Sequence, residues 1–300
     1  GCGKSLTSLS IMGLLPSRAR VSAKTMSFNG VPLLDMAERD LSDIRGDRMA
    51  MIFQEPMTSL NPAYSIGNQL MEPLIRHRNA SKDEARKRAI FLLEKVGITA
   101  AESRLNQFPH QLSGGLRQRV MIAMALMCDP ELIIADEPTT ALDVTIQAQI
   151  LHLLAELRRE FNSALILITH DLGVVARVAD KVAVMYAGRI VETGRVEEVF
   201  NNPMHPYTQG LINCIPVPGK TARGSRLGSI PGIVPTLVGE TQGCSFRNRC
   251  AYAGPACEID DPLVELSPGR SYRCVLPEDQ LKRQGRETMG KTGPLEAASA

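Results

Sequence analysis

Residues His110–Asp143, HQLSGGLRQRVMIAMALMCDPELIIADEPTTALD, contain the pattern that decides the fold. The Ser-Gly-Gly turn at 113–115 can begin a helix, with Ser113 as its N-cap. A helix N-terminus carries about half a positive charge, so such a turn favours an anion as its ligand. An ordinary glycine-rich cap is the alternative interpretation. The apolar run LIIA then predicts a buried strand that ends at the carboxylates Asp136 and Glu137.

Adjacent carboxylates at the end of a buried strand need an explanation. Two ionised carboxylates repel each other and are costly to desolvate unless a cation is near. Mg²⁺ with bound phosphates would supply this cation and so offset the repulsion and the cost of desolvation. The stretch is therefore typical of a protein that holds and hydrolyses a nucleoside triphosphate.

The start of the chain supplies a candidate phosphate loop. GCGKS matches the last five positions of the motif G-x-x-x-x-G-K-[ST], in which backbone N–H groups and the Lys bind phosphates and the hydroxyl binds Mg²⁺. A G-K-S triplet alone is more often a surface turn. Because the match begins inside the motif, we expect a chain truncated at its N-terminus. The residues of this site are Gly1, Cys2, Gly3, Lys4 and Ser5.

Two further polar residues follow expected strands. Gln54 comes after the apolar run at 49–53, and His170 stands just past the strand expected at 164–168. Each could be a solvated or structural residue. Ligands of α/β sheets bind at the carboxyl ends of the strands, so both are candidates to contact the terminal phosphate, Mg²⁺ or the attacking water.

Together these motifs resemble the nucleotide-binding subunit of ATP-binding cassette (ABC) transporters, from residue 1 to about residue 200. GCGKS is similar to the end of Walker A, and Gln54 to the Q-loop. LSGGLRQRV is similar to the signature, LIIADEP to Walker B, ALD to the D-loop, and His170 to the switch histidine. The resemblance implies an α/β P-loop NTPase of the ABC type, with a helical signature subdomain at about 64–128. Leu116 stands where many family members have Gln.

The resemblance also implies roles for the residues that act on this chain's own ATP. Lys4 would neutralise phosphate charge, and Ser5 and Asp136 would hold Mg²⁺. Glu137 would polarise the attacking water, and Gln54 and His170 would sense the terminal phosphate.

The ABC family works as a head-to-tail pair of ATPase subunits. Ser113, Gly114 and Gly115 would therefore contact ATP bound by the opposite, homologous subunit, while Asp143 would line the interface between the two.

The segment NNPMHPYTQGLINCIP at 201–216 resembles the His-Pro-Tyr segment of dipeptide and oligopeptide importer ATPases. This implies peptide import, with nickel, glutathione or another small solute as the alternative. The implied partners are two membrane permease subunits and an extracytoplasmic peptide-binding protein, and the implied place is the cytoplasmic face of the bacterial inner membrane. We expect a C-terminal extension at 201–277 and a disordered tail at 278–300.

Four cysteines cluster in this small extension, with five, six and sixteen residues between successive members. Four thiolates suit either a 4Fe–4S cluster or structural zinc, and buried thiols without a metal are the remaining alternative. Short C-x₂₋₄-C pairs typical of zinc are missing, and the resemblance to peptide-importer ATPases favours 4Fe–4S. The four residues are Cys244, Cys250, Cys257 and Cys274.

Composition excludes some classes of function. The 34 basic and 32 acidic residues nearly balance, so no electrostatic signal favours nucleic acid. The longest apolar run, VMIAMALMC at 120–128, is about half of the roughly 20 residues that a membrane helix requires. A soluble ABC ATPase of translation or DNA repair, and an iron–sulfur redox protein, are the rival classes.

Overall fold

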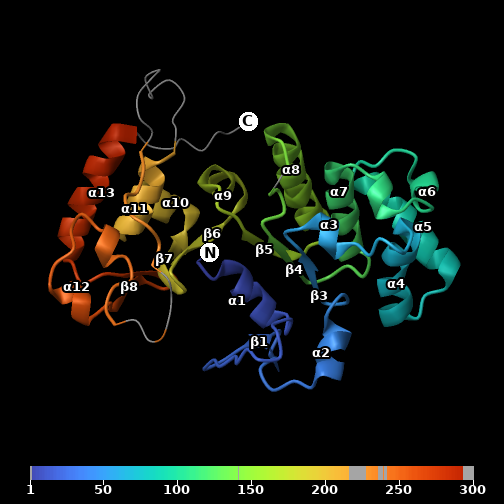
Figure 1. The fold of residues 1–300 in the computed structure, drawn as a ribbon, viewed down its shortest axis with the longest axis horizontal. Coiled ribbons are helices and arrows are strands. Elements are labelled where there is room, and N and C mark those ends of the chain that lie inside the picture. Colours follow the sequence, from blue (N-terminus) through green and yellow to red (C-terminus); the bar gives the residue numbers. More distant parts are fainter. Residues whose placement is uncertain (1, 141, 216–227, 236–238, 240–241, 293–300) are drawn as a thin grey trace. The chain divides into compact units, whose positions relative to one another are not determined.

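The computed structural model describes residues 2–140, 142–215, 228–235, 239 and 242–292. The chain forms two compact units, an N-terminal unit of Ser5–His170 and a C-terminal unit of Asp171–Ala300 with Gly1–Lys4 (Figure 1). In the described part of the chain, no helix is both long and apolar enough to cross a membrane.

The N-terminal unit has a parallel sheet with the strand order β3-β4-β5. The five residues of β4 pair with all five of β5, from Leu132 opposite Ala164 to Asp136 opposite Ile168. Its elements are α1 (Lys4–Ile11), β1 (Ser27–Phe28), β2 (Val31–Pro32), α2 (Glu38–Ile44), β3 (Met49–Ile52), α3 (Pro56–Ser59), α4 (Ile66–Arg78), α5 (Lys82–Lys95), α6 (Ala101–Arg104), η1 (Pro109–Gln111), α7 (Gly114–Ala125), β4 (Leu132–Asp136), α8 (Val144–Glu160) and β5 (Ala164–Ile168).

Alternate side chains of this sheet enter two different cores, because successive residues of a strand point to opposite faces. Ile52 and Ile133 pack in one core with helices α4 to α8, whereas Met49 and Ile134 pack in another with α1 and α2. Figure 1 shows these two groups of helices on the two sides of β3 and β4. A parallel sheet covered on both faces is the α/β architecture that the sequence predicted.

Local signals in the sequence place several helix starts. Ser81 and Glu84, spaced as S-x-x-E, form a capping box, with Ser81 Oγ accepting from the peptide N–H of Glu84. Ser113 caps α7 and Asp143 caps α8 by accepting N–H groups in the same way. Within residues 21–32 the strand pairing is short, and Ser27–Phe28 form a hairpin with Val31–Pro32.

The C-terminal unit is built on an antiparallel sheet with the strand order β6-β7-β9-β8. Strands β6 and β7 form an antiparallel hairpin, and β9 adds to its edge through the pairs Glu192–Tyr272 and Thr193–Ser271. Its elements are α9 (Leu172–Val178), β6 (Lys181–Tyr186), β7 (Arg189–Arg195), α10 (Val196–Asn201), α11 (Pro206–Asn213), η2 (Arg247–Arg249), α12 (Ala256–Ile259), β8 (Leu263–Ser267), β9 (Arg270–Arg273) and α13 (Glu278–Thr292).

The segment 278–300, expected to be disordered, forms α13 as far as Thr292; residues 293–300 lie outside the described part. Among the side chains of this polar helix that the structure describes, one apolar side chain anchors it. Leu281 is fully buried with Met204 and Tyr272, and its carbonyl accepts from the Gln209 side chain. A single anchor gives no periodic pattern, which is why the sequence did not predict the helix.

Candidate functional site

The carboxyl ends of the three parallel strands bring the expected polar residues of the N-terminal unit together. Asp136 ends β4 and Glu137 follows it, Gln54 lies two residues after β3, and His170 lies two residues after β5. Gln54 Nε2 donates to Glu137 Oε2 over 3.2 Å, and His170 Nδ1 lies 3.5 Å from the same oxygen. Parallel pairing places these strand ends at one edge, so the sequence could predict this meeting.

The backbone of Glu137 is in the left-handed region, with φ of 45°. Its peptide N–H donates to the carbonyl of Ile168 on β5 over 2.9 Å, which ties the residue after β4 to the neighbouring strand. Thr140 Oγ1 donates to Glu137 Oε2 over 2.9 Å. Thr140 lies outside the motifs of this site, although its place three residues after the carboxylate, in a turn, is a usable signal.

Asp136 is buried, and its Oδ1 accepts from Ser5 Oγ over 3.0 Å. A hydroxyl and a carboxylate are oxygen ligands of the kind that Mg²⁺ takes, usually one or two from the protein with the rest from phosphates and water. Ser5 and Asp136 therefore fit Mg²⁺, which does not require several protein carboxylates. Gly1 lies outside the described residues, and Cys2, Gly3 and Lys4 group with the C-terminal unit.

The signature glycines pack closely against the start of α8. A Cβ on Gly115 would lie 3.3 Å from Ile146 Cγ2, and one on Gly114 would lie 3.8 Å from Leu142 Cδ2. Ser113 and Asp143 both serve as helix caps within this chain. These residues therefore have a structural role here, whatever they contact in a partner subunit.

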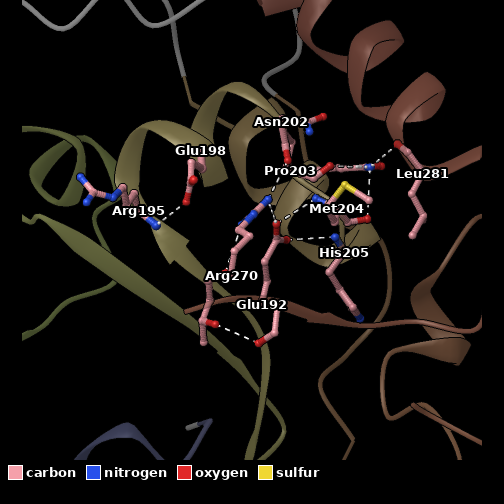
Figure 2. Close-up of polar contacts among 12 residues, drawn as sticks. Glu192, Arg195, Glu198, Asn202, Pro203, Met204, His205, Arg270 and Leu281 are labelled. Carbon is pink, nitrogen blue, oxygen red and sulfur yellow. Dashed lines mark hydrogen bonds and ion pairs between the residues drawn. The ribbon is translucent and has the colours of Figure 1, made fainter. Parts of the chain in front are cut away.

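A second polar cluster lies in the C-terminal unit, around Glu192 of β7. Its carboxylate accepts from the peptide N–H groups of Met204 and His205, each over 2.9 Å, and pairs with Arg270 over 2.9 Å (Figure 2). Burial raises the pKa of Glu192, while the Met204 N–H and Arg270 act in the opposite direction. A Cβ at Gly194 would lie 2.6 Å from Arg270 Cδ, so only glycine lets the arginine stem pass.

The four clustered cysteines all line one small cavity of the C-terminal unit, together with His205 and Phe246. Burial raises the pKa of Cys244 and Cys250, and that of Cys274 to about 11. No set of three or more His, Cys, Asp or Glu side chains within the described residues has the arrangement of a metal site. Cys2, Cys128 and Cys214 lie outside the cavity lining.

The peptide groups around three of these cysteines point to the sulfur atoms. Cys244, Cys250 and Cys274 each accept a hydrogen bond from the peptide N–H two residues on. For Cys250 this N–H belongs to Tyr252, with nitrogen and sulfur 3.4 Å apart. Such bonds favour the thiolate, which is the form that binds metals.

Solved structures of ATP-binding cassettes are similar to this chain. The ATP-binding cassette MJ0796, solved as a dimer in a post-hydrolysis state with ADP and phosphate, is 29% identical, with a TM-score of 0.57 over 65% of this chain and 81% of that one. CbiO1 of Clostridium perfringens, part of an ABC transporter complex, is 30% identical, with a TM-score of 0.56 over 66% and 75% of the two chains.

Comparison with known sequences places the chain in a family. A model described as "ABC transporter" matches residues 1–140, and one described as "Oligopeptide/dipeptide transporter, C-terminal region" matches residues 191–257. The oligopeptide transport ATP-binding protein OppD of Salmonella typhimurium is 50% identical over 94% of this chain and 83% of its own length. The dipeptide transport ATP-binding protein DppD of Escherichia coli is 50% identical over 94% and 86%. The chain thus belongs to the ABC transporter ATP-binding subunits, in their oligopeptide/dipeptide transporter branch.

Proposed function

We propose that this chain hydrolyses ATP to energise the import of dipeptides or oligopeptides through a membrane transporter. The observation that carries the proposal is the setting of Glu137, a carboxylate at a strand end held by Gln54, Thr140 and His170. The relatives named for oligopeptide and dipeptide transport supply the substrate class. Nickel, glutathione or another small solute remains the alternative cargo.

In this mechanism Glu137 acts as the general base. Its carboxylate accepts hydrogen bonds from Gln54 and Thr140, which hold it in one orientation, and its side chain is 17% exposed, so water can approach it and give up a proton. Ser5 and Asp136 would hold Mg²⁺, which supplies charge neutralisation on the phosphates. Lys4 would add a positive charge to the phosphate loop, and transfer to water then depends mainly on positioning.

The partners follow from the family. ATPase subunits of this kind pair head to tail, so Ser113 to Gly115 would contact ATP bound by a homologous subunit and Asp143 would line that interface. Two permease subunits and an extracytoplasmic peptide-binding protein would complete the importer. The ATPase would then sit as a peripheral subunit on the cytoplasmic face of the bacterial inner membrane.

The decisive experiment is Glu137→Gln in the assembled transporter, reconstituted in liposomes with its binding protein. We expect ATP binding to persist and hydrolysis to fall on the order of a hundredfold or more, the usual effect of a lost catalytic base. Glu156→Gln on α8, which changes a half-exposed carboxylate paired with His152, is the matched control. Near-normal turnover by Glu137→Gln would reject the assignment.

The cargo is tested in the same liposomes. Uptake of a labelled tripeptide, Ni²⁺ and glutathione is measured with and without ATP in the wild-type transporter. ATP-dependent accumulation of the peptide alone supports peptide import. Accumulation of Ni²⁺ or glutathione without peptide would replace it by the alternative cargo.

For the C-terminal unit we propose that the four clustered cysteines bind a 4Fe–4S cluster, with zinc as the alternative. Their thiols line a single cavity, and three of them receive peptide N–H bonds, a setting that suits metal-bound sulfur. Four thiolates are the donor set that both metals accept. The role is structural or regulatory, because ATP hydrolysis transfers no electron.

Metal content decides between these possibilities. Protein purified without oxygen should be brown, with visible absorbance and iron and sulfide in equal amounts, and Cys257→Ser should lose both. A colourless sample with one zinc per chain would replace the cluster by zinc. A sample with no metal would reject the site.

A further inference from the structure

The His-Pro-Tyr segment at 205–207 is the distinctive motif of the C-terminal unit that ATP hydrolysis does not use. Pro206 occupies the first turn of α11, where its missing N–H costs nothing. The Tyr207 ring packs against Tyr186 and Phe246, with ring centres 4.6 and 5.4 Å apart. Packing and helix geometry thus account for the proline and the tyrosine, but not for the choice of histidine.

Three of the four hydrogen-bonding groups of His205 have partners inside the protein. The His205 carbonyl accepts from the peptide N–H of Gln209 over 3.1 Å. The His205 peptide N–H donates to Glu192 over 2.9 Å, and its Nδ1 accepts from the peptide N–H of Tyr207 over 3.0 Å. An Nδ1 that accepts a hydrogen bond carries no proton, so the ring is neutral and its one proton is on Nε2. The geometry therefore sets the tautomer.

The remaining group, the Nε2–H, belongs to an imidazole that lines the cavity of the four cysteines. The imidazole is 1% exposed and lines that cavity with the cysteines and Phe246, whose ring centre is 5.8 Å away. Figure 2 shows the side chain directed away from the Glu192 carboxylate. No hydrogen bond from Nε2 is present among the residues that the structure describes. A buried donor of this kind requires an acceptor. The cavity is lined by the four sulfurs and by Asp261, whose carboxylate is paired with Arg189 and Arg273, so sulfur is the acceptor that we assign.

We propose that His205 is a positioning residue of the cysteine site, whose Nε2–H donates a hydrogen bond to a sulfur of the metal-loaded cavity. This role rests on the metal site proposed above. Outer-shell donors orient metal ligands and commonly change metal affinity 10- to 100-fold, and hydrogen bonds to the sulfurs help set the potential of iron–sulfur clusters. Because Glu192 holds the same residue by its peptide N–H, the hydrogen bond would connect the metal site to β7.

Two substitutions separate this role from simple capping of α11. In His205→Asn the side-chain oxygen can replace Nδ1 and still cap the helix, since Asn is a good N-cap, but nothing reaches the cavity. In His205→Gln the longer amide can place an N–H near the position of Nε2, while the cap is lost. Each variant thus retains one of the two functions of the ring.

The test uses the full chain, purified without oxygen, as wild type, His205→Asn and His205→Gln. Metal content, loss of metal to a chelator and, for iron, the midpoint potential are measured, with circular dichroism to verify folding. We expect His205→Asn to fold and to hold its metal about tenfold more weakly, with a more negative potential if the metal is a cluster, and His205→Gln to lie closer to wild type. Nitrogen NMR of labelled histidine should show the Nε2–H tautomer in wild type.

The opposite order would overturn the proposal. If His205→Asn matches wild type in metal retention and potential while His205→Gln is impaired, the histidine is only a helix cap. An Nδ1–H tautomer in wild type would also overturn it. Wild-type protein without any metal would instead reject the cysteine site itself, so the two failures are distinguishable.

Discussion

Glu137 in the N-terminal unit and Glu192 in the C-terminal unit are both carboxylates on or directly after a core strand, yet their surroundings differ. The Glu137 side chain is 17% exposed, and Gln54, Thr140 and His170 lie around its Oε2. The Glu192 side chain is fully buried, and both of its oxygens have partners, two peptide N–H groups and the Arg270 guanidinium.

The different surroundings of Glu137 and Glu192 suit the two carboxylates to different roles. An oriented carboxylate with some access to water can accept a proton during a reaction. A carboxylate that is buried and paired on both oxygens has no capacity left for a substrate, and removing one partner leaves an uncompensated charge. The first arrangement suits chemistry and the second suits the joining of β7, β9 and the His-Pro-Tyr segment.

The largest effect that tests this comparison is expected from Arg270→Met. It leaves Glu192 buried without its cation and removes the donors to the carbonyls of Thr193 and Asn202. The free energy of unfolding of the C-terminal unit should fall by about 3–5 kcal/mol, measured by chemical denaturation. Lys282→Met, which breaks an exposed pair with Glu278, is the control and should lose less than about 1 kcal/mol. Equal losses would mean that burial of the pair does not matter.

A smaller effect is expected from Thr140→Val, which removes one of the groups that orient Glu137. Losing a hydrogen bond of about 1 kcal/mol should lower ATP hydrolysis about fivefold, while ATP binding and stability stay near wild type. Thr140→Ser keeps the hydroxyl and should restore turnover. If valine and serine behaved alike, the hydroxyl would have no part in holding the carboxylate.

The smallest effect concerns a third glutamate, Glu84, which is exposed and holds the start of α5. Ser81→Ala should lower stability by about 0.5–1 kcal/mol. Hydrogen bonds from Ser81 lower the pKa of Glu84, so its contribution is present above the unfolded pKa and is lost as pH falls through the lowered value. The acid side of the stability profile, followed by thermal unfolding, should therefore be shallower in Ser81→Ala. An unchanged profile would show that the capping box is not formed in solution.

The features that the sequence predicted are those with local or periodic signals. The run LIIA before Asp136 and Glu137 is a strand, and Ser113 caps the helix that begins at the Ser-Gly-Gly turn. The meeting of Gln54, Glu137 and His170 was predictable too, because parallel strands align their carboxyl ends at one edge.

The features that escaped prediction depend on partners distant in the chain. Nothing near Glu192 indicates that Arg270 will cross Gly194 to reach it, since the pairing of β7 with β9 creates that contact. Helix α13 escaped for a related reason, because the burial of Leu281 against Met204 and Tyr272 depends on residues distant in the chain.

The most direct measurement makes the same change, Glu to Gln, at both positions of the assembled transporter, and records ATP hydrolysis and thermal unfolding for each. We expect Glu137→Gln to lose on the order of a hundredfold or more in hydrolysis with little change in unfolding temperature. Glu192→Gln should unfold at a lower temperature, because Arg270 loses its counter-charge, yet hydrolyse ATP when folded. Normal hydrolysis by Glu137→Gln, or loss of hydrolysis in folded Glu192→Gln, would contradict the assignment of Glu137 as the catalytic base.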